Sequence, residues 1–201
     1  MQKIQVVVIH GGDAFRSLEE YVQFLRDFPL TIEQVRPRRD WKSTLPEVLG
    51  EEYDVLAPVM PNKTNAQFSE WSLWFEKMFP FLQDGVMLIG HSLGGMFLAR
   101  YLAERVLPRR IAALFLVAAP HNQSGECGDF TVPESLDGVA RQVEKIFLFH
   151  SADDAVVPFS ELAVYAQHLP NARSMTFTNR GHFNQSAFPE LVARITGMGS
   201  P

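Results

Sequence analysis

Short apolar runs rich in β-branched residues alternate with segments of helical periodicity along the whole chain. The runs typical of strands cover residues 4–9, 54–58, 86–89, 111–117, 145–149 and 174–177. The helical patterns cover residues 17–27, 41–49, 66–79, 96–105, 159–169 and 189–195. Because the strand runs are almost continuously hydrophobic, both faces of their sheet should be covered. The sequence therefore predicts an α/β fold, with a mainly parallel six-stranded sheet and helices on both faces.

Composition narrows the class of protein further. A chain of 201 residues, 46% hydrophobic and 20% charged, fits one globular α/β domain over residues 1–201. A net charge of −5 without a Lys/Arg-rich block argues against a nucleic-acid partner. The single cysteine, Cys127, cannot form an internal disulfide, and no apolar run approaches the ~20 residues needed to cross a bilayer. We expect a soluble, cytoplasmic protein without a membrane partner; its oligomeric state is not specified by these features.

The segment Gly90-His91-Ser92-Leu93-Gly94 lies between the third strand run and the helical pattern that follows it. A serine flanked by glycines at a strand-to-helix turn is the arrangement of a nucleophile elbow, which exposes the hydroxyl above the carboxyl edge of the sheet. From average glycine and serine usage, about one chain in twenty of this length carries the pattern by chance. The strand and helix on either side favour the functional interpretation. Ser92 is therefore the candidate nucleophile.

A serine hydroxyl needs an adjacent base to remove its proton during attack. His182 follows a glycine in the loop after the last strand run, where it can reach the sheet edge. His91 lies inside the elbow, and His150 and His168 fall on a predicted strand and a predicted helix. His182 is therefore the expected base.

The base in turn needs a carboxylate to fix its tautomer. Asp153 and Asp154 both follow the fifth strand run, and neighbours in an extended stretch point to opposite sides. We select Asp154, four residues before Pro158, and Asp153 remains the alternative. Either aspartate could instead cap the next helix, but both lie early for that role.

Attack on a carbonyl creates a negative oxygen that preset N–H donors must stabilise. The backbone N–H of Leu93, directly after the serine, is the first expected donor. The second is expected from the glycine pair after the first strand run, with Gly12 preferred and Asp13 as the alternative. A phosphate-binding role for this glycine pair is disfavoured because no Gly-x-Gly-x-x-Gly or Walker lysine accompanies it.

With these motifs in place, the chain resembles the α/β-hydrolase superfamily over essentially its whole length. The matching segments are His10-Gly11, Gly90-His91-Ser92-Leu93-Gly94-Gly95, Asp154 before Val157-Pro158, and Gly181-His182. Residues 153–158 and 181–183 are similar to the small, lidless serine hydrolases related to the retinoblastoma-binding serine hydrolase. Members of that group often carry proline where this chain has Ala155 and have a less glycine-rich elbow, so no substrate is transferred.

The resemblance implies a serine hydrolase that cleaves a small ester, thioester or amide through a Ser-His-Asp triad and an acyl-enzyme, with carboxylesterase-like activity. It also implies a small-molecule acyl substrate and neither a metal nor an organic cofactor. Because a fold does not fix a reaction, two alternatives stand beside it: a binding or scaffold protein with an inherited triad, and an acyltransferase.

The segment 119–142 leaves room for a loop and one helix, too little for a large lid, so a shallow or open pocket is expected. The candidate wall residues are Phe15, Met60, Trp71, Phe97, His121, Phe130 and Phe183.

Overall fold

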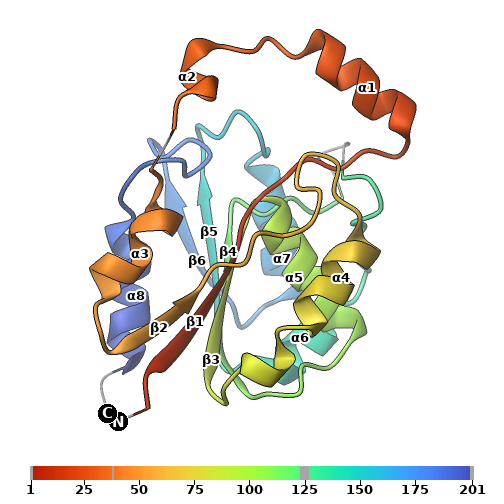
Figure 1. Ribbon diagram of the computed structural model, residues 1–201. Coiled ribbons are helices and arrows are strands. Elements are labelled where there is room, and N and C mark those ends of the chain that lie inside the picture. The colour runs from red at the N-terminus through yellow and green to blue at the C-terminus, as the bar shows by residue number, and fades with distance from the viewer. Residues whose placement is uncertain (1, 38, 123–126, 200–201) are drawn as a thin grey trace.

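A computed structural model describes residues 2–37, 39–122 and 127–199 (Figure 1). Six strands form one sheet in the order β2-β1-β3-β4-β5-β6, and every neighbouring pair is parallel. The strands are β1 (Ile4–Ile9), β2 (Tyr53–Leu56), β3 (Val86–His91), β4 (Ile111–Val117), β5 (Ile146–Ser151) and β6 (Arg173–Phe177). The predicted six-stranded parallel sheet is confirmed.

The helices alternate with these strands along the chain. They are α1 (Leu18–Asp27), α2 (Ile32–Val35), α3 (Trp41–Leu49), α4 (Phe68–Glu76), α5 (Leu93–Glu104), α6 (Asp137–Gln142), α7 (Ser160–His168) and α8 (Pro189–Gly199), with a 3-10 turn η1 (Phe79–Phe81). The sequence pattern identifies six of them, although α5 begins three residues before the predicted start. The short α2 and η1 were not predicted, and α6 takes the room left for one helix after β4.

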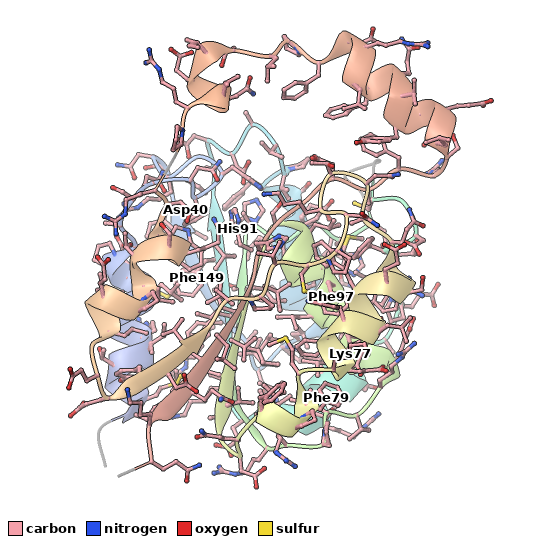
Figure 2. All side chains as sticks on the ribbon, viewed as in Figure 1. Asp40, Lys77, Phe79, His91, Phe97 and Phe149 are labelled. Carbon is pink, nitrogen blue, oxygen red and sulfur yellow. The ribbon has the colours of Figure 1, made fainter. Side chains whose placement is uncertain are left out.

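Hydrophobic cores lie on both faces of the sheet. On one face, α3 and α8 cover a core that contains Trp41, Phe149 and Leu191. On the other face, α4 to α7 cover a core that contains Phe75 and Phe97. Figure 2 shows Phe149 and Phe97 on opposite sides of the strands. Covering both faces explains why the strands read as continuous apolar runs rather than as alternating ones.

The strand order reverses next to β1, and this reversal indicates where a ligand site should lie. From β1 the chain goes to β2 on one side, and then crosses to β3 on the other side. In parallel α/β sheets, ligands bind beyond the carboxyl ends of the strands at such a switch point. Here β1 and β3 end side by side, with Ile9 opposite Gly90. The loop after β1 and the turn after β3 therefore meet at one edge.

One segment lies outside the two helical layers. Residues 16–37, called here the α1–α2 arch, pass above the carboxyl edge of the sheet between β1 and α3 (Figure 1). No residue of α1 or α2 is buried. The arch is thus a surface structure over the edge where the site is expected.

The turn from β3 to α5 requires backbones to approach closely. A Cβ atom at Gly94 would lie 2.4 Å from the Ile9 carbonyl oxygen, and one at Gly90 would lie 2.5 Å from the Gly94 carbonyl oxygen. Real Cβ atoms essentially never come that near to backbone atoms. The glycines of the elbow thus allow α5 to begin directly against β1.

We expect Gly94→Ala to lower the free energy of unfolding by about 1–3 kcal/mol, because the added methyl group meets backbone that cannot move aside. Gly197→Ala is the matched control, since its Cβ would meet nothing within 4 Å and it lies in α8. That variant should gain up to ~1 kcal/mol from helix propensity. Urea unfolding measures the free energy of unfolding of both variants. Equal stability of Gly94→Ala and Gly197→Ala would contradict the packing argument.

Candidate active site

Ser92 occupies a strained turn between β3 and α5. Its backbone has φ 54° and ψ −127°, a conformation that residues other than glycine rarely adopt. Two backbone hydrogen bonds hold Ser92 in this conformation. The Ser92 N–H donates to the Val117 carbonyl at 2.8 Å, and the Ser92 carbonyl accepts from the Gly95 N–H at 2.8 Å. Such strain of about 1–3 kcal/mol persists only where the surroundings impose it, and it gathers at functional sites.

His182 and Asp154 form a hydrogen-bonded pair beside this turn. The His182 Nδ1–H donates to Asp154 Oδ2 at 2.9 Å, and the Asp154 side chain is fully buried. Because an ionised carboxylate only accepts, the proton lies on Nδ1 and leaves Nε2 with a free lone pair. An imidazole in this tautomer can take a proton at Nε2.

The other oxygen of Asp154 is fixed by backbone. Oδ1 accepts from the N–H groups of Val156 at 2.8 Å and Val157 at 3.0 Å. Burial opposes ionisation, but the hydrogen bonds from His182 and from these two amides outweigh it, so the pKa of Asp154 lies below its ordinary value. Asp154 is therefore held as an anion in one orientation.

The neighbouring carboxylate faces elsewhere. Asp153 accepts from the Ser151 hydroxyl and from the Gly181 N–H, the latter at 2.9 Å. Of the two candidates, Asp154 contacts the imidazole while Asp153 orders the loop before it. The two side chains diverge because Asp153 lies in a turn, closed by the Asp154 N–H donating to the Ser151 carbonyl at 3.2 Å, and not in the extended stretch that the sequence argument assumed.

The His182 loop is tied to the body by buried donors that the sequence did not reveal. Trp41 Nε1–H donates to the Phe183 carbonyl at 2.8 Å, and His91 Nε2–H donates to the His182 carbonyl at 2.8 Å. Gly181 and Phe183 both have positive φ, near 50°, so the loop turns sharply on either side of His182. No sequence signal marked Trp41, because an aromatic residue at the start of an amphipathic helix reads as ordinary core.

His91 is a buried neutral imidazole. It lies at the carboxyl end of β3, below the arch (Figure 2), with its Nδ1 3.5 Å from the Lys42 ammonium. Burial, followed by the charge of Lys42, holds the pKa of His91 well below its ordinary value. Lys42 is itself paired with Asp40 at 2.6 Å. His91 therefore positions the backbone of His182 without carrying charge.

Two segments adjoin Ser92, namely the first turn of α5 and the loop after β1. Leu93 begins α5, where N–H groups have no partner within the helix. In the loop after β1, the Asp13 N–H donates to the Lys63 carbonyl at 2.8 Å, so it is already engaged. Among the described residues, no backbone carbonyl accepts a hydrogen bond from the N–H of Gly12, and a Cβ atom on adjacent Gly11 would lie 2.9 Å from Ser92 Cβ. The geometry favours Gly12 over Asp13 as the loop's donor.

Two cavities meet at Ser92. The first, of about 340 Å³, is lined by polar groups that include His182, His10 and Lys63. The second, of about 170 Å³, is lined by Leu93, Phe15 and Val157 among others, and its lining is about as polar as that of the first. Ser92 thus lies on the boundary between the two cavities.

Most of the expected wall residues belong to the core instead. Only Phe15 lines either of the cavities at Ser92, and the other six are at most 5% exposed. Trp71, for example, donates from Nε1 to the Pro61 carbonyl and packs against His10. Helical periodicity alone cannot separate an aromatic residue that fills the core from one that lines a cavity beside it.

Comparison with known proteins identifies the family of this chain. The profile of the serine hydrolase family matches residues 34–191. The chain belongs to the serine hydrolase family. The serine hydrolase RBBP9 of Rattus norvegicus is 30% identical over 154 residues, which cover 74% of this chain and 80% of the rat protein. The matched region of the family contains Ser92, Asp154 and His182.

Solved structures support the fold. The ydeN gene product of B. subtilis superposes with a TM-score of 0.73 at 20% identity, covering 99% of this chain and 100% of the other. An esterase domain from a Rhodothermus marinus protein gives a TM-score of 0.58 at 16% identity, covering 96% and 82%. At these identities the likeness establishes an α/β-hydrolase-like fold.

The residues that the structure describes contain neither a membrane-spanning helix nor a metal-binding cluster. None of its helices combines the length and the apolar character that crossing a membrane requires. Among the same residues, no three His, Cys, Asp or Glu side chains are grouped in a way that could hold a metal ion.

The buried neutral His91 makes stability depend on pH. In the unfolded chain this imidazole takes up a proton near pH 6.5, whereas in the folded protein it does so only well below that value. The unfolded state binds more protons in this window, so the free energy of unfolding should fall as pH falls below ~6.5, by at most ~1.4 kcal/mol per pH unit from His91.

Urea unfolding between pH 8 and pH 5 measures this slope, and His91→Gln isolates the contribution. The glutamine amide can still donate to the His182 carbonyl but does not titrate. We expect the wild-type and variant stabilities to differ by a constant above pH 7 and to converge below pH 6.5. If the free energies of unfolding of the wild-type protein and of His91→Gln differ by the same amount at every pH, His91 does not contribute to the pH dependence of stability.

Proposed function

We propose that this chain hydrolyses a small ester, thioester or amide through an acyl-enzyme, with Ser92 as nucleophile, His182 as base and Asp154 as its carboxylate. The observation that carries the proposal is the hydrogen bond between the buried Asp154 carboxylate and His182, together with the strained Ser92, which lines the same cavity as His182. Membership of the serine hydrolase family supports the reaction class.

In the first half of the reaction, Ser92 Oγ attacks the carbonyl carbon while His182 Nε2 takes the hydroxyl proton. The carbonyl oxygen becomes negative and accepts hydrogen bonds from the backbone N–H groups of Leu93 and Gly12. The bond to the leaving group then breaks, and His182 delivers its proton to that group. An ester of Ser92 remains. Asp154 stabilises the imidazolium that exists between the two proton transfers.

In the second half, water attacks the acyl-enzyme and loses a proton to His182. The tetrahedral intermediate collapses, Ser92 Oγ leaves with the proton from His182, and the carboxylic acid is released. Every group in this cycle returns to its starting state.

Replacing Ser92 with alanine removes the nucleophile and should lower kcat by up to ~10⁶, the scale found where a triad acts as one unit. Hydrolysis of p-nitrophenyl acetate measures the loss. Labelling with a fluorophosphonate, followed by peptide mapping, should modify Ser92 in the wild-type protein. A wild-type protein that is neither labelled nor able to turn over an acyl substrate would be a binding protein, and the proposal would fail.

The two adjacent aspartates provide a matched pair. In Asp154→Asn the amide oxygen can still accept from Val156 and Val157, but the amide nitrogen then faces His182 Nδ1. That contact favours the tautomer protonated at Nε2, which cannot take the serine proton, and kcat should fall on the order of 10⁴.

Asp153→Asn is the control, because Asp153 contacts Ser151 and Gly181 and does not contact the imidazole. We expect it to lower kcat less than tenfold. Similar losses in the two variants would show that the carboxylates order the loop and do not set the histidine tautomer. Circular dichroism and urea unfolding establish that both variants are folded.

A further inference from the structure

Two lysines line the cavity of about 340 Å³ that holds Ser92 and His182. Lys42 comes from the first turn of α3, and Lys63 comes from the loop between β2 and α4. The acidic side chain on the described lining is Asp13. The mechanism proposed above uses neither lysine, so their presence beside the nucleophile of a protein with a net charge of −5 calls for an explanation.

Lys42 is held in place and keeps one donor in reserve. Its ammonium is paired with Asp40 at 2.6 Å, lies 3.5 Å from His91 Nδ1 and lies 5.1 Å from the centre of the Trp41 ring. The side chain is only 15% exposed. An ammonium has three N–H donors, and Asp40 and His91 account for two. The third is available to a group that enters the cavity.

Lys63 provides a second positive charge. Among the described residues, its ammonium forms no ion pair. Its backbone is fixed beside the cavity, because its carbonyl accepts from the Asp13 N–H at 2.8 Å. An unpaired cation at the mouth of a cavity attracts an anionic group more strongly than a neutral one.

The charges of both lysines act on a ring that lines the same cavity. Burial lowers the pKa of His10, and the positive charges of Lys63 and Lys42 lower it further. Both ammoniums therefore lie near this lining. Burial raises the pKa of the Asp13 carboxyl, and neither lysine offsets that shift, so Asp13 is not their counter-ion.

The proposed chemistry decides which part of a substrate meets the lysines. His182 must protonate the leaving group, and it lines this cavity but not the second cavity at Ser92. The His91 ring, which Lys42 contacts, has its centre 5.0 Å from that of the His182 ring. The leaving group therefore extends toward the lysines. This step rests on the function proposed above.

We propose that Lys42 and Lys63 form a subsite for a carboxylate carried by the leaving group. The substrate class is then an acylated hydroxy acid or amino acid, and hydrolysis releases the acyl part as one acid and the hydroxy acid or amino acid as the other product. The two lysines determine specificity by binding the carboxylate and take no part in proton transfer.

The test compares p-acetoxybenzoate with the neutral p-acetoxybenzamide, which share the acetyl group and differ in the charge of the leaving group. Each kcat/KM is divided by the rate constant for hydroxide hydrolysis of the same ester, which removes differences in intrinsic reactivity. We expect the benzoate to be preferred by about tenfold. Added sodium chloride should reduce this preference, because salt screens exposed charges.

Lys63→Gln should lower the preference severalfold by raising KM for the benzoate, since the contact exists in the ground state and in the transition state alike. Lys63→Glu should lower it further by repelling the carboxylate. Lys42→Gln should also lower it. Because both esters are measured in the same variant, any effect of Lys42 on His91 and on the catalytic groups cancels in the ratio.

Lys77→Gln is the matched control, because it changes the net charge by the same amount. Lys77 is exposed at the end of α4, below His91 in Figure 2, and lines neither cavity at Ser92. Its loss should leave the preference intact. Equal reduction in Lys63→Gln and Lys77→Gln would show an effect of net charge alone and would overturn the proposal.

The outcome separates this inference from the proposed function. Fluorophosphonate labelling of Ser92 with hydrolysis of both esters, but with no dependence on the charge of the leaving group, would overturn the subsite alone. Absence of both labelling and turnover would overturn the hydrolase function and the subsite with it.

Discussion

The site depends on one close contact, the approach of the first turn of α5 to the end of β1. Gly94 lies so near the carbonyl oxygens of Ile9 and His10 that any side chain would strike them. This contact lets α5 begin at Leu93 without a connecting loop, which forces Ser92 into its positive φ. The same contact places the loop after β1 against the serine. The strained turn at Ser92, the N-terminus of α5 and the position of the loop after β1 therefore follow from one packing constraint.

The histidine side of the site is held by a different means. His182 lies in a loop, and loops are usually the mobile part of a fold. Here its backbone is bound by Trp41 from α3 and His91 from β3, and its ring by Asp154 from the loop after β5. The bond from Trp41 is buried and the other two are partly buried, so all three are stronger than in water, and an unpaired carbonyl would be costly. The position of His182 thus depends on three separate elements of the fold.

The difference between the local turn at Ser92 and the long-range contacts at His182 explains what could be predicted from the sequence. The strands, most helices and the residues Ser92, Asp154 and His182 follow from local patterns, since strand ends in a parallel sheet share one edge. Three features could not be predicted locally: the role of Trp41, the engagement of the Asp13 N–H by Lys63, and the position of α1. Each depends on contacts between segments distant in the sequence. The pattern correctly indicated that residues 17–27 are helical, but it carried no information about what that helix would cover.

The stability of the α1–α2 arch depends on its contacts with the rest of the fold. A ten-residue helix without buried residues is marginal by itself in water, so tertiary contacts must supply most of its stability. For α1 these contacts include the aromatic packing of Tyr21 and Phe24 on Phe15. The position of α1 over the carboxyl edge of the sheet therefore depends on aromatic packing against Phe15, a residue that also lines one of the cavities at Ser92.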